Sequence, residues 1–256
     1  MKVAITGANG EIGRILAPFL AARHDVRLGT WELTAGREPA SFHDPRLEAR
    51  RLDVRDPDDV RSFVEGADAV IHLAGERETS ADWQRLSGPN IEGTFNVFDA
   101  CREHSVGKIV FASSNHVTGG YDLGDQRGLN GSEPVRPDSL YGVTKAFGEA
   151  LGRFMSDAHG ISVICLRIGW VLPEPLGLEA LGPEALGPEA LTAEAVRMWL
   201  SPRDLCDLVA SSLQAQVPYG IYYGTSKNTR RLWDLGPAMK DLGYNPVDDS
   251  EAFAQR

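Results

Sequence analysis

The chain has 256 residues, of which 42% are hydrophobic and 24% charged, a composition typical of a globular protein with a sizeable core. Its formal net charge of −10 argues against nucleic acid and anionic membranes as partners, although it does not exclude an anionic small molecule. No apolar stretch reaches the roughly 18 residues of a membrane helix and no signal peptide is visible, so we expect a cytoplasmic protein.

Short apolar runs alternate with amphipathic stretches along the first two thirds of the chain, a pattern typical of βαβ units around a parallel sheet. The expected strands are Val3–Thr6, Val26–Gly29, Ala49–Leu52, Ala69–Leu73, Lys108–Ser113 and Ser162–Arg167. The expected helices are Glu11–Ala22, Pro57–Glu65, Trp83–His104 and Tyr141–His159. We therefore predict an α/β fold in which residues 1–168 form a Rossmann-like, doubly wound parallel sheet that binds a dinucleotide.

The pattern changes after Arg167. Residues 173–195 contain the sequence LGPEA twice, and the Gly-Pro pairs permit only short helical turns. Beyond this insert we expect a helix at Pro202–Gln214 capped by Ser201, a strand at Tyr219–Tyr223 and a final helix near Trp233–Leu242. Residues 169–256, with the insert, are predicted to form a small substrate-binding lobe within a single structural unit.

The three cysteines, Cys101, Cys165 and Cys206, are widely spaced in apolar segments. This spacing indicates buried thiols rather than a disulfide or a metal site, and we expect no metal.

A glycine-rich turn follows the first expected strand and opens the first helix. Gly7 permits the tight turn, Gly10 allows close approach to a pyrophosphate, and Gly13 allows the helix to pack on the strand. The second strand ends at Thr30, where dinucleotide sites usually carry an acidic residue for the ribose hydroxyls. Without that carboxylate a 2′-phosphate is not repelled, and Arg27 or Arg37 could pair with one, so the end of this strand leaves the choice of cofactor open. We expect NAD, with NADP also possible.

Asp53 follows the third expected strand. It is placed either to meet the adenine edge or to cap the end of the strand, and the sequence favours neither.

Tyr141 and Lys145 are four residues apart at the start of an expected helix and so share one face. A phenol has a pKa near 10, which is too high for a base at neutral pH, but a nearby ammonium favours the phenolate. A serine hydroxyl at a neighbouring strand end would hold the reacting oxygen. The spacing alone is more typical of a solvated helix face, so the surrounding motifs decide the interpretation.

Several motifs occur in order: Gly7-xx-Gly10-xx-Gly13, His72-Leu-Ala-Gly75, Asn90-Ile-Glu-Gly-Thr94, Ser113-Ser114 and Tyr141-xxx-Lys145. As a set they resemble the extended short-chain dehydrogenase/reductase superfamily over nearly the whole chain. The segments Phe111–His116, Leu140–Lys145, Arg167–Gly169, Met198–Asp204 and Leu242–Tyr244 are similar to uronate dehydrogenases and to their haloarchaeal sister group, the NAD-dependent glucose-6-phosphate dehydrogenases.

This resemblance implies oxidation at C1 of a cyclic sugar. Tyr141 would take the anomeric hydroxyl proton, Ser114 would orient that hydroxyl, and Lys145 would bind the nicotinamide ribose and lower the pKa of Tyr141. Asn115 and His116 would hydrogen-bond sugar hydroxyls. The implied cofactor site comprises Gly7, Asn9, Gly10, Glu11, Ile12, Gly13, Thr30, Asp53, Val54, Leu73, Ala74, Gly75, Asn90 and Ile168.

Three features depart from the uronate dehydrogenase pattern. Trp170 stands where a small serine is usual, and Glu76 and Arg77 stand where small or polar residues are usual. The arginine that clamps the substrate carboxylate is replaced by Glu194, so we expect Arg197, three residues later, or Arg77 to take this part.

The favoured function is oxidation of a hexuronate, glucuronate or galacturonate, to its aldarolactone. The alternatives are a glucose-6-phosphate dehydrogenase, a nucleotide-sugar epimerase or dehydratase, and a non-catalytic dinucleotide sensor. The short chain after Arg167 counts against the epimerase, and the intact catalytic set counts against the sensor. The superfamily often pairs through the two long helices, so a homo-oligomer is also expected.

Overall fold

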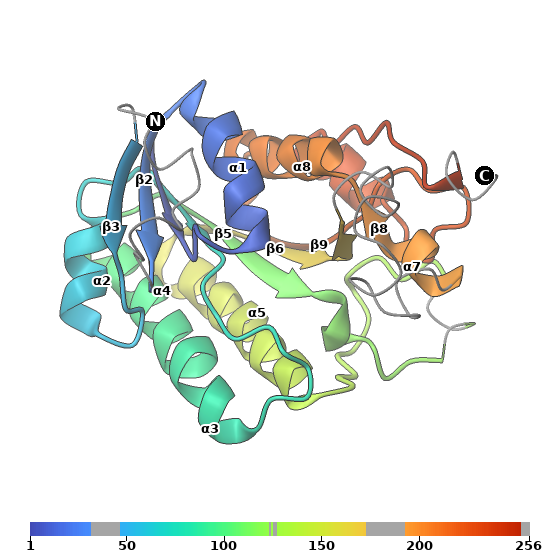
Figure 1. Ribbon diagram of the computed structural model, residues 1–256, viewed down its shortest axis with the longest axis horizontal. Coiled ribbons are helices and arrows are strands. Elements are labelled where there is room, and N and C mark those ends of the chain that lie inside the picture. The colour runs from blue at the N-terminus through green and yellow to red at the C-terminus, as the bar shows by residue number, and fades with distance from the viewer. Residues whose placement is uncertain (32–46, 123, 125–126, 173–192, 252–256) are drawn as a thin grey trace, which may run out of the picture.

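The computed structural model describes residues 1–31, 47–122, 124, 127–172 and 193–251. Its centre is a sheet of parallel strands in the order β3-β2-β1-β4-β5-β6-β9, all within the described residues (Figure 1). The strands are β1 (Lys2–Thr6), β2 (Asp25–Thr30), β3 (Leu47–Arg51), β4 (Ala69–His72), β5 (Lys108–Ser114), β6 (Ser162–Ile168) and β9 (Tyr219–Gly224). The strand order reverses at β1, so the predicted Rossmann-like sheet is confirmed.

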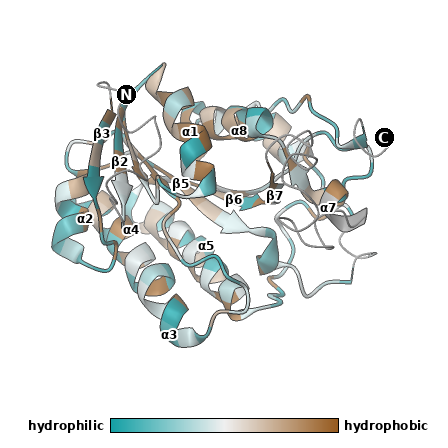
Figure 2. Cartoon of the chain, in the orientation of Figure 1, coloured by the Kyte–Doolittle hydropathy of each residue, from teal (hydrophilic) through white to brown (hydrophobic). Residues whose placement is uncertain are grey.

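Helices cover both faces of this sheet (Figure 1). One face carries α1 (Glu11–Ala21) and α8 (Pro202–Gln214), and the other carries α2 (Pro57–Val64), α4 (Gly93–Glu103) and α5 (Leu140–His159). Each layer has its own apolar core. β4 is buried along its whole length, whereas the edge strand β3 is largely hydrophilic, as suits a strand with solvent on one side (Figure 2).

Side-chain caps fix where the helices begin. The Asp56 carboxylate accepts from the Asp58 and Asp59 amides ahead of α2, and the Ser201 hydroxyl accepts from the Asp204 amide ahead of α8. The Ser139 hydroxyl accepts from the Gly142 amide and starts α5. This cap sets the position of the first turns of α5, which carry Tyr141 and Lys145.

The long helix predicted at Trp83–His104 is interrupted. The structure has α3 (Trp83–Leu86), a π-helical segment at Ser87–Glu92 and then α4. Pro89 lies in the π-helical segment, and since proline has no N–H it cannot continue the regular ladder.

The final helix was also predicted to begin too early. Trp233 is not helical; it is buried, and its ring stacks on Tyr223 with centroids 4.8 Å apart. Burial of this indole against β9 takes precedence over the local helical pattern, and a π-helical turn at Ala238–Leu242 is what remains.

Two elements of the predicted lobe belong to the main layers. β9 is a strand of the main sheet and α8 packs beside α1. β7 (Trp170–Val171) and β8 (Trp199–Leu200) pair in a separate two-stranded sheet, and α7 (Ala193–Met198) directly precedes β8. Most of the predicted insert, residues 173–192, lies outside the described residues.

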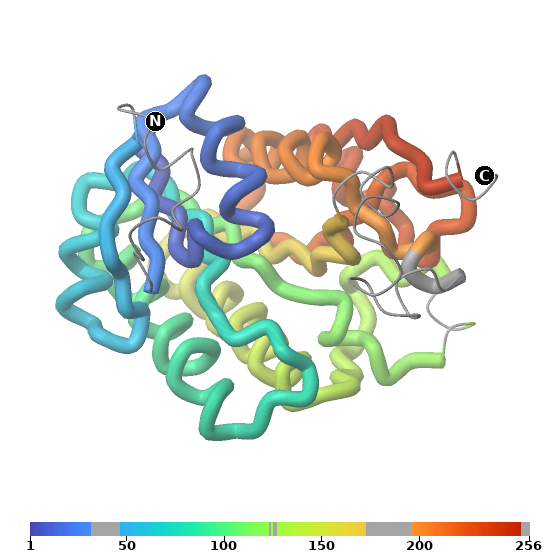
Figure 3. Tube along the Cα trace, viewed as in Figure 1, coloured from blue at the N-terminus to red at the C-terminus, as the bar shows by residue number. Residues whose placement is uncertain are grey.

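The last described segment, drawn in red, passes the N-terminal turns of α8 (Figure 3). The Asp204 carboxylate accepts hydrogen bonds from the backbone amides of Val247 and Asp248, each at 3.0 Å. All three cysteines are free and buried, as predicted. Among the described residues no helix is long and apolar enough to span a membrane.

Candidate active site

A large cavity opens at the carboxyl ends of the central strands. It has a volume of about 1,030 Å³. Its lining includes Gly7, Gly10–Gly13, Thr30, Trp31, Leu52–Arg55, Leu73–Arg77, Thr79, Gln84, Arg85, Gly88, Pro89, Ala112–His116, Tyr141, Lys145, Ile168–Val171 and Met198. Because carboxyl strand ends flanking a reversal of strand order are where open α/β sheets bind ligands, this cavity is the candidate active site.

One end of the cavity is shaped for a pyrophosphate. Gly7 has φ +69°, and a Cβ there would lie 2.6 Å from the Ala74 amide nitrogen. A Cβ on Gly13 would lie 2.4 Å from the Ala8 carbonyl oxygen, so helix and turn touch backbone to backbone. Gly10 caps α1 without a side-chain hydrogen bond, which leaves the first amides of the helix available to an anion. The described residues therefore fit a bound dinucleotide.

The adenosine end of the cavity lies between the ends of β2 and β3. Thr30 is paired in register with Arg51, and the guanidinium groups of Arg51 and Arg55 lie 4.7 and 4.4 Å from the centre of the Trp31 ring. Arg55 also pairs with Asp53 at 2.9 Å and so holds the pKa of that carboxyl below its usual value. Arg55 thus lines this end of the cavity, and Arg51 lies beside it without being among the lining residues.

Arg27, one of the residues expected to meet a 2′-phosphate, points elsewhere. Its guanidinium binds Glu48 and the backbone carbonyls of Phe63 and Glu65, and it does not line the cavity. Arg37, the other residue expected to pair with a 2′-phosphate, lies outside the described residues. The sequence missed Arg51, because only the pairing of β2 with β3 brings it beside Thr30.

Ser114, Tyr141 and Lys145 meet at the other end of the cavity. Ser114 ends β5, while the first turns of α5 bring Tyr141 and Lys145 over it. The Lys145 ammonium donates to the Ala112 carbonyl at 2.8 Å and lies 5.5 Å from the centre of the Tyr141 ring.

Burial dominates the electrostatics of this pair. It lowers the pKa of Lys145 to about 8. Burial also raises the pKa of Tyr141, against the lowering effects of a hydrogen bond with Ser114 and of the positive charge on Arg77. A phenolate at Tyr141 thus depends on cations close to it, which is the tuning that proton transfer near neutral pH requires.

The remaining cavity wall carries polar groups beside Tyr141. Asn115 and His116 follow β5 in a 3₁₀ turn, and the His116 ring meets the Tyr141 ring edge-on at 5.8 Å between centroids. Arg77 lines the cavity and pairs with Glu11 at 3.0 Å. Trp170 also lines the cavity and is 38% exposed.

Met198 also lines this wall and was not singled out from the sequence, whereas Arg197 is not among the described lining residues. The amide nitrogen of the Asn115 side chain donates to the Met198 sulfur at 3.9 Å. Met198 is therefore the residue through which α7 borders the substrate end.

Two residues expected at the cofactor do not line the cavity. The Asn90 side chain is buried, accepts from the Glu76 amide at 2.7 Å and donates to the Glu76 carbonyl and the Thr144 hydroxyl. It thereby ties the loop after β4 to α5. The Asn9 side chain instead accepts from Arg14.

A buried ion pair joins α5 to the sheet. Arg167 on β6 makes two 2.9 Å hydrogen bonds to the Glu149 carboxylate on α5, which also accepts from the Ser113 hydroxyl at 2.6 Å. Both charges are almost fully buried. Since Glu149 lies one turn beyond Lys145, this pair fixes α5 to β5 and β6 directly below the site.

Comparison with known proteins adds the family. Residues 3–172 match the model of the NAD dependent epimerase/dehydratase family. In Haloferax volcanii, an L-arabinose 1-dehydrogenase (NAD(P)⁺) is 36% identical over 99% of both chains. An NAD-dependent glucose-6-phosphate dehydrogenase of that organism is also 36% identical, over 98% of this chain and 95% of its own.

The uronate dehydrogenase of Pseudomonas putida is 37% identical over 98% of this chain and 86% of its own. The structure of a mutant uronate dehydrogenase from Agrobacterium tumefaciens, complexed with NAD, superposes with a TM-score of 0.85. The two sequences are 31% identical, and the superposition covers 99% of this chain and 87% of the uronate dehydrogenase chain. The resemblance read from the sequence motifs is therefore confirmed.

Proposed function

The chain belongs to the NAD dependent epimerase/dehydratase family as a sugar dehydrogenase of the uronate dehydrogenase type, and from this premise we propose that it oxidises C1 of a free hexuronate to the aldarolactone. The observation that carries the proposal is the meeting of Ser114, Tyr141 and Lys145 in one cavity, beside Asn115 and His116. Glucuronate and galacturonate are the expected substrates.

The reaction needs a base at the anomeric hydroxyl and a hydride acceptor at C1. NAD, when bound along the glycine turn, supplies the hydride acceptor. Tyr141 takes the proton of the anomeric hydroxyl, and Ser114 holds the same oxygen with its hydroxyl. Lys145, fixed by the Ala112 carbonyl, stabilises the tyrosinate and holds the nicotinamide ribose.

The position of Arg77 favours an acidic sugar over a neutral one as the substrate. Its charge acts on Tyr141, so it lies within electrostatic reach of the reacting hydroxyl, and it is 81% exposed at the side chain. A guanidinium can pair with a planar carboxylate through two parallel hydrogen bonds. We propose that Arg77 exchanges Glu11 for the substrate carboxylate.

The activity is tested by following reduction of NAD with glucuronate, galacturonate, glucose 6-phosphate, L-arabinose and glucose. The proposal expects the largest kcat/KM with a hexuronate. A larger kcat/KM with L-arabinose or glucose 6-phosphate would instead favour the activity for which the haloarchaeal relatives are named.

For the cofactor, we propose that NADP is accepted besides NAD and that Arg51 is the reason. Arg51 lies directly beside Thr30, where a carboxylate would repel a 2′-phosphate, and no carboxylate among the described residues forms an ion pair with it. An arginine in this place can pair with the 2′-phosphate.

Replacing Arg51 by Ser is expected to raise KM for NADP about tenfold, the equivalent of about 1.4 kcal/mol, and to leave KM for NAD nearly unchanged. The neighbouring Arg50→Ser is the matched control, because Arg50 turns toward α2 and binds Ser62 and the Asp59 carbonyl. Equal effects of Arg51→Ser on both cofactors would contradict a 2′-phosphate contact.

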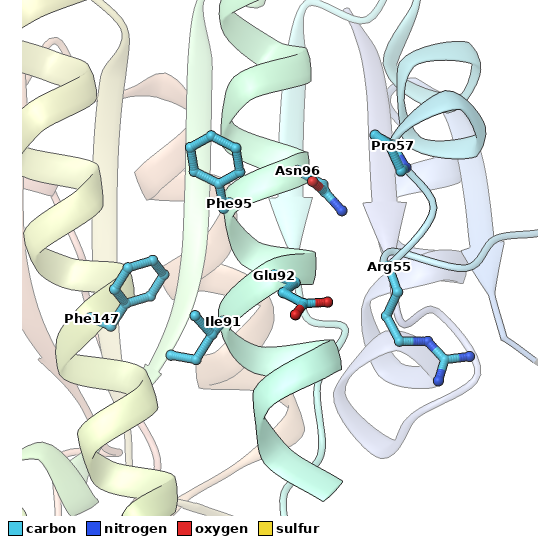
Figure 4. Close-up of a pocket in the computed structure, with 7 residues that line it drawn as sticks. All are labelled: Arg55, Pro57, Ile91, Glu92, Phe95, Asn96 and Phe147. Atoms are coloured by element: carbon cyan, nitrogen blue, oxygen red, sulfur yellow. The ribbon is translucent and has the colours of Figure 1, made fainter. Parts of the chain in front are cut away.

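We also propose that two copies pair through the face formed by α4 and α5. Phe95, Val143 and Phe154 are each about half exposed on this face, at 47%, 46% and 56%. A shallow groove of about 400 Å³ lies over the π-helical segment and the first turn of α4. Ile91, Phe95 and Phe147 of α5 lie on one side of the helix there, and Glu92 and Asn96 point to the other side, toward Arg55 and Pro57 (Figure 4). An apolar patch rimmed by opposite charges suits a self-complementary, two-fold interface.

Sedimentation is expected to give a mass near twice 27.8 kDa for the wild type and near that of a single chain for Phe95→Glu. Met239→Glu, which adds a charge at another exposed apolar residue, controls for the substitution and should remain paired. A monomeric wild type would exclude this interface.

A further inference from the structure

His116 has a carboxylate partner that the sequence did not indicate. Its Nδ1 lies 2.8 and 3.0 Å from the two oxygens of Asp138. Asp138 comes 22 residues later, just before the cap of α5. Both side chains are about one third exposed, and His116 faces the cavity beside Tyr141.

The two segments that carry this pair are joined by their backbones. The Arg136 amide donates to the Val117 carbonyl at 2.9 Å, and the Gly120 amide donates to the Arg136 carbonyl at 2.8 Å. Gly119 lies against the Asp138 carboxylate, and there is no room for a side chain at this position because a Cβ on Gly119 would lie 1.9 Å from Asp138 Oδ2. Asp138 is thus held in a fitted position and is not a loosely placed surface carboxylate.

The hydrogen bonds around Asp138 determine the proton on His116. The Ser139 hydroxyl accepts from the Gly142 amide and donates its only hydrogen to Asp138 Oδ1 at 2.9 Å. An ionised carboxylate has acceptors only, so the imidazole nitrogen that faces it must carry a hydrogen. In a neutral imidazole the other nitrogen, Nε2, then has a free lone pair.

Nε2 has no hydrogen-bond partner within the described part of the chain. The amide nitrogen of the adjacent Asn115 donates to the Met198 sulfur, which is a weak acceptor. A sugar hydroxyl placed between them would accept from Asn115 and donate to Nε2. Neither contact alone would use both functions of the hydroxyl, whereas together they use its hydrogen and one of its two lone pairs.

We propose that Asp138 is a positioning residue that keeps His116 protonated on Nδ1 and thereby presents Nε2 as the acceptor for a sugar hydroxyl. The inference rests on the proposed function for the identity of the ligand. It adds a residue that acts through His116 and touches neither substrate nor cofactor. Sugars that lack this hydroxyl are discriminated against because they leave Nε2 unpaired.

Asp138→Asn is the sharpest test, since it keeps the shape of the side chain. The Ser139 hydroxyl still donates to Oδ1, which turns the new amide nitrogen toward His116 as a donor. This nitrogen stands in place of the oxygen nearer to Nδ1, at 2.8 Å against 3.0 Å for Oδ1, and its N–H donates to Nδ1, so we expect the imidazole hydrogen on Nε2. Gly119→Ala, which displaces the carboxylate, provides a second variant that leaves both side chains chemically unchanged.

Two measurements follow. Nitrogen-15 NMR of the neutral imidazole, identified by its loss in His116→Gln, is expected to show Nδ1–H in the wild type and Nε2–H in Asp138→Asn. In steady-state kinetics the variant is expected to raise KM for the hexuronate about tenfold while kcat and the Kd for NAD change little. The control is Asp157→Asn, which removes an exposed carboxylate that pairs with Arg153 on α5. It should leave KM for the hexuronate unchanged.

The proposal is overturned if wild-type His116 carries its hydrogen on Nε2, or if Asp138→Asn moves the hydrogen without raising KM. A parallel loss of NAD affinity would mean that the variant disturbs the whole site and would also overturn it. Failure of the wild type to oxidise any hexuronate would count against the proposed function, while the NMR measurement, which needs no substrate, still decides the role of Asp138.

Discussion

Replacing Tyr141 by Phe is expected to lower kcat by about 10³-fold while the Kd for NAD stays within about twofold, because the change removes one hydroxyl that acts only on the proton. Tyr141 is half-buried at the cavity wall beside Lys145, and its ring remains to pack there. The measurement is steady-state turnover of a hexuronate together with NAD titration by fluorescence.

Tyr222→Phe is the matched control. Its hydroxyl binds Asp241 at 3.2 Å and does not line the cavity, so its removal should leave kcat within about twofold. If Tyr141→Phe kept a tenth or more of the wild-type kcat, the base would have to be another group.

Replacing Lys145 by Met is expected to abolish turnover and at the same time to change how stability depends on pH. Burial lowers the pKa of Lys145 from 10.5 to about 8, so the folded state carries the cost of a buried charge below pH 8. Between pH 8 and 10.5 the unfolded chain binds this proton and the folded chain does not, and the wild type therefore gains stability as the pH rises.

Relative to the Met variant, the free energy of unfolding of the wild type should rise by about 3 kcal/mol across this interval. The quantity to measure is the difference between the two proteins by denaturant unfolding at several pH values, with the exposed Lys227→Met as a control for removal of a charge. A difference that stays constant from pH 7 upward would show that Lys145 is not desolvated in the folded state.

The sequence predicted the parts of the molecule that depend on local pattern. The glycine turn, the buried strands and the Ser201 and Pro202 start of α8 all follow from residues close together in the chain. The positions of Tyr141 and Lys145 on one helix turn follow from their spacing. The family resemblance then supplied what spacing alone could not, namely the role of this pair.

What the sequence missed depends on contacts between distant segments. Arg51 reaches Trp31 only because β3 pairs with β2, and Asp138 reaches His116 only because the chain doubles back before α5. Asn90 belongs to the family motif, yet its side chain holds the Glu76 loop and does not line the cavity. No local periodicity reports such pairings, since each is set by the fold as a whole.

The central claim is that hydride leaves C1 of a hexuronate, and it is tested most directly with glucuronate deuterated at C1. We expect net reduction of NAD, with the deuterium on the reduced cofactor and a lactone as the sugar product. Deuterium that remains on the sugar, with no net reduction of the cofactor, would contradict the account and would point to an epimerase or dehydratase.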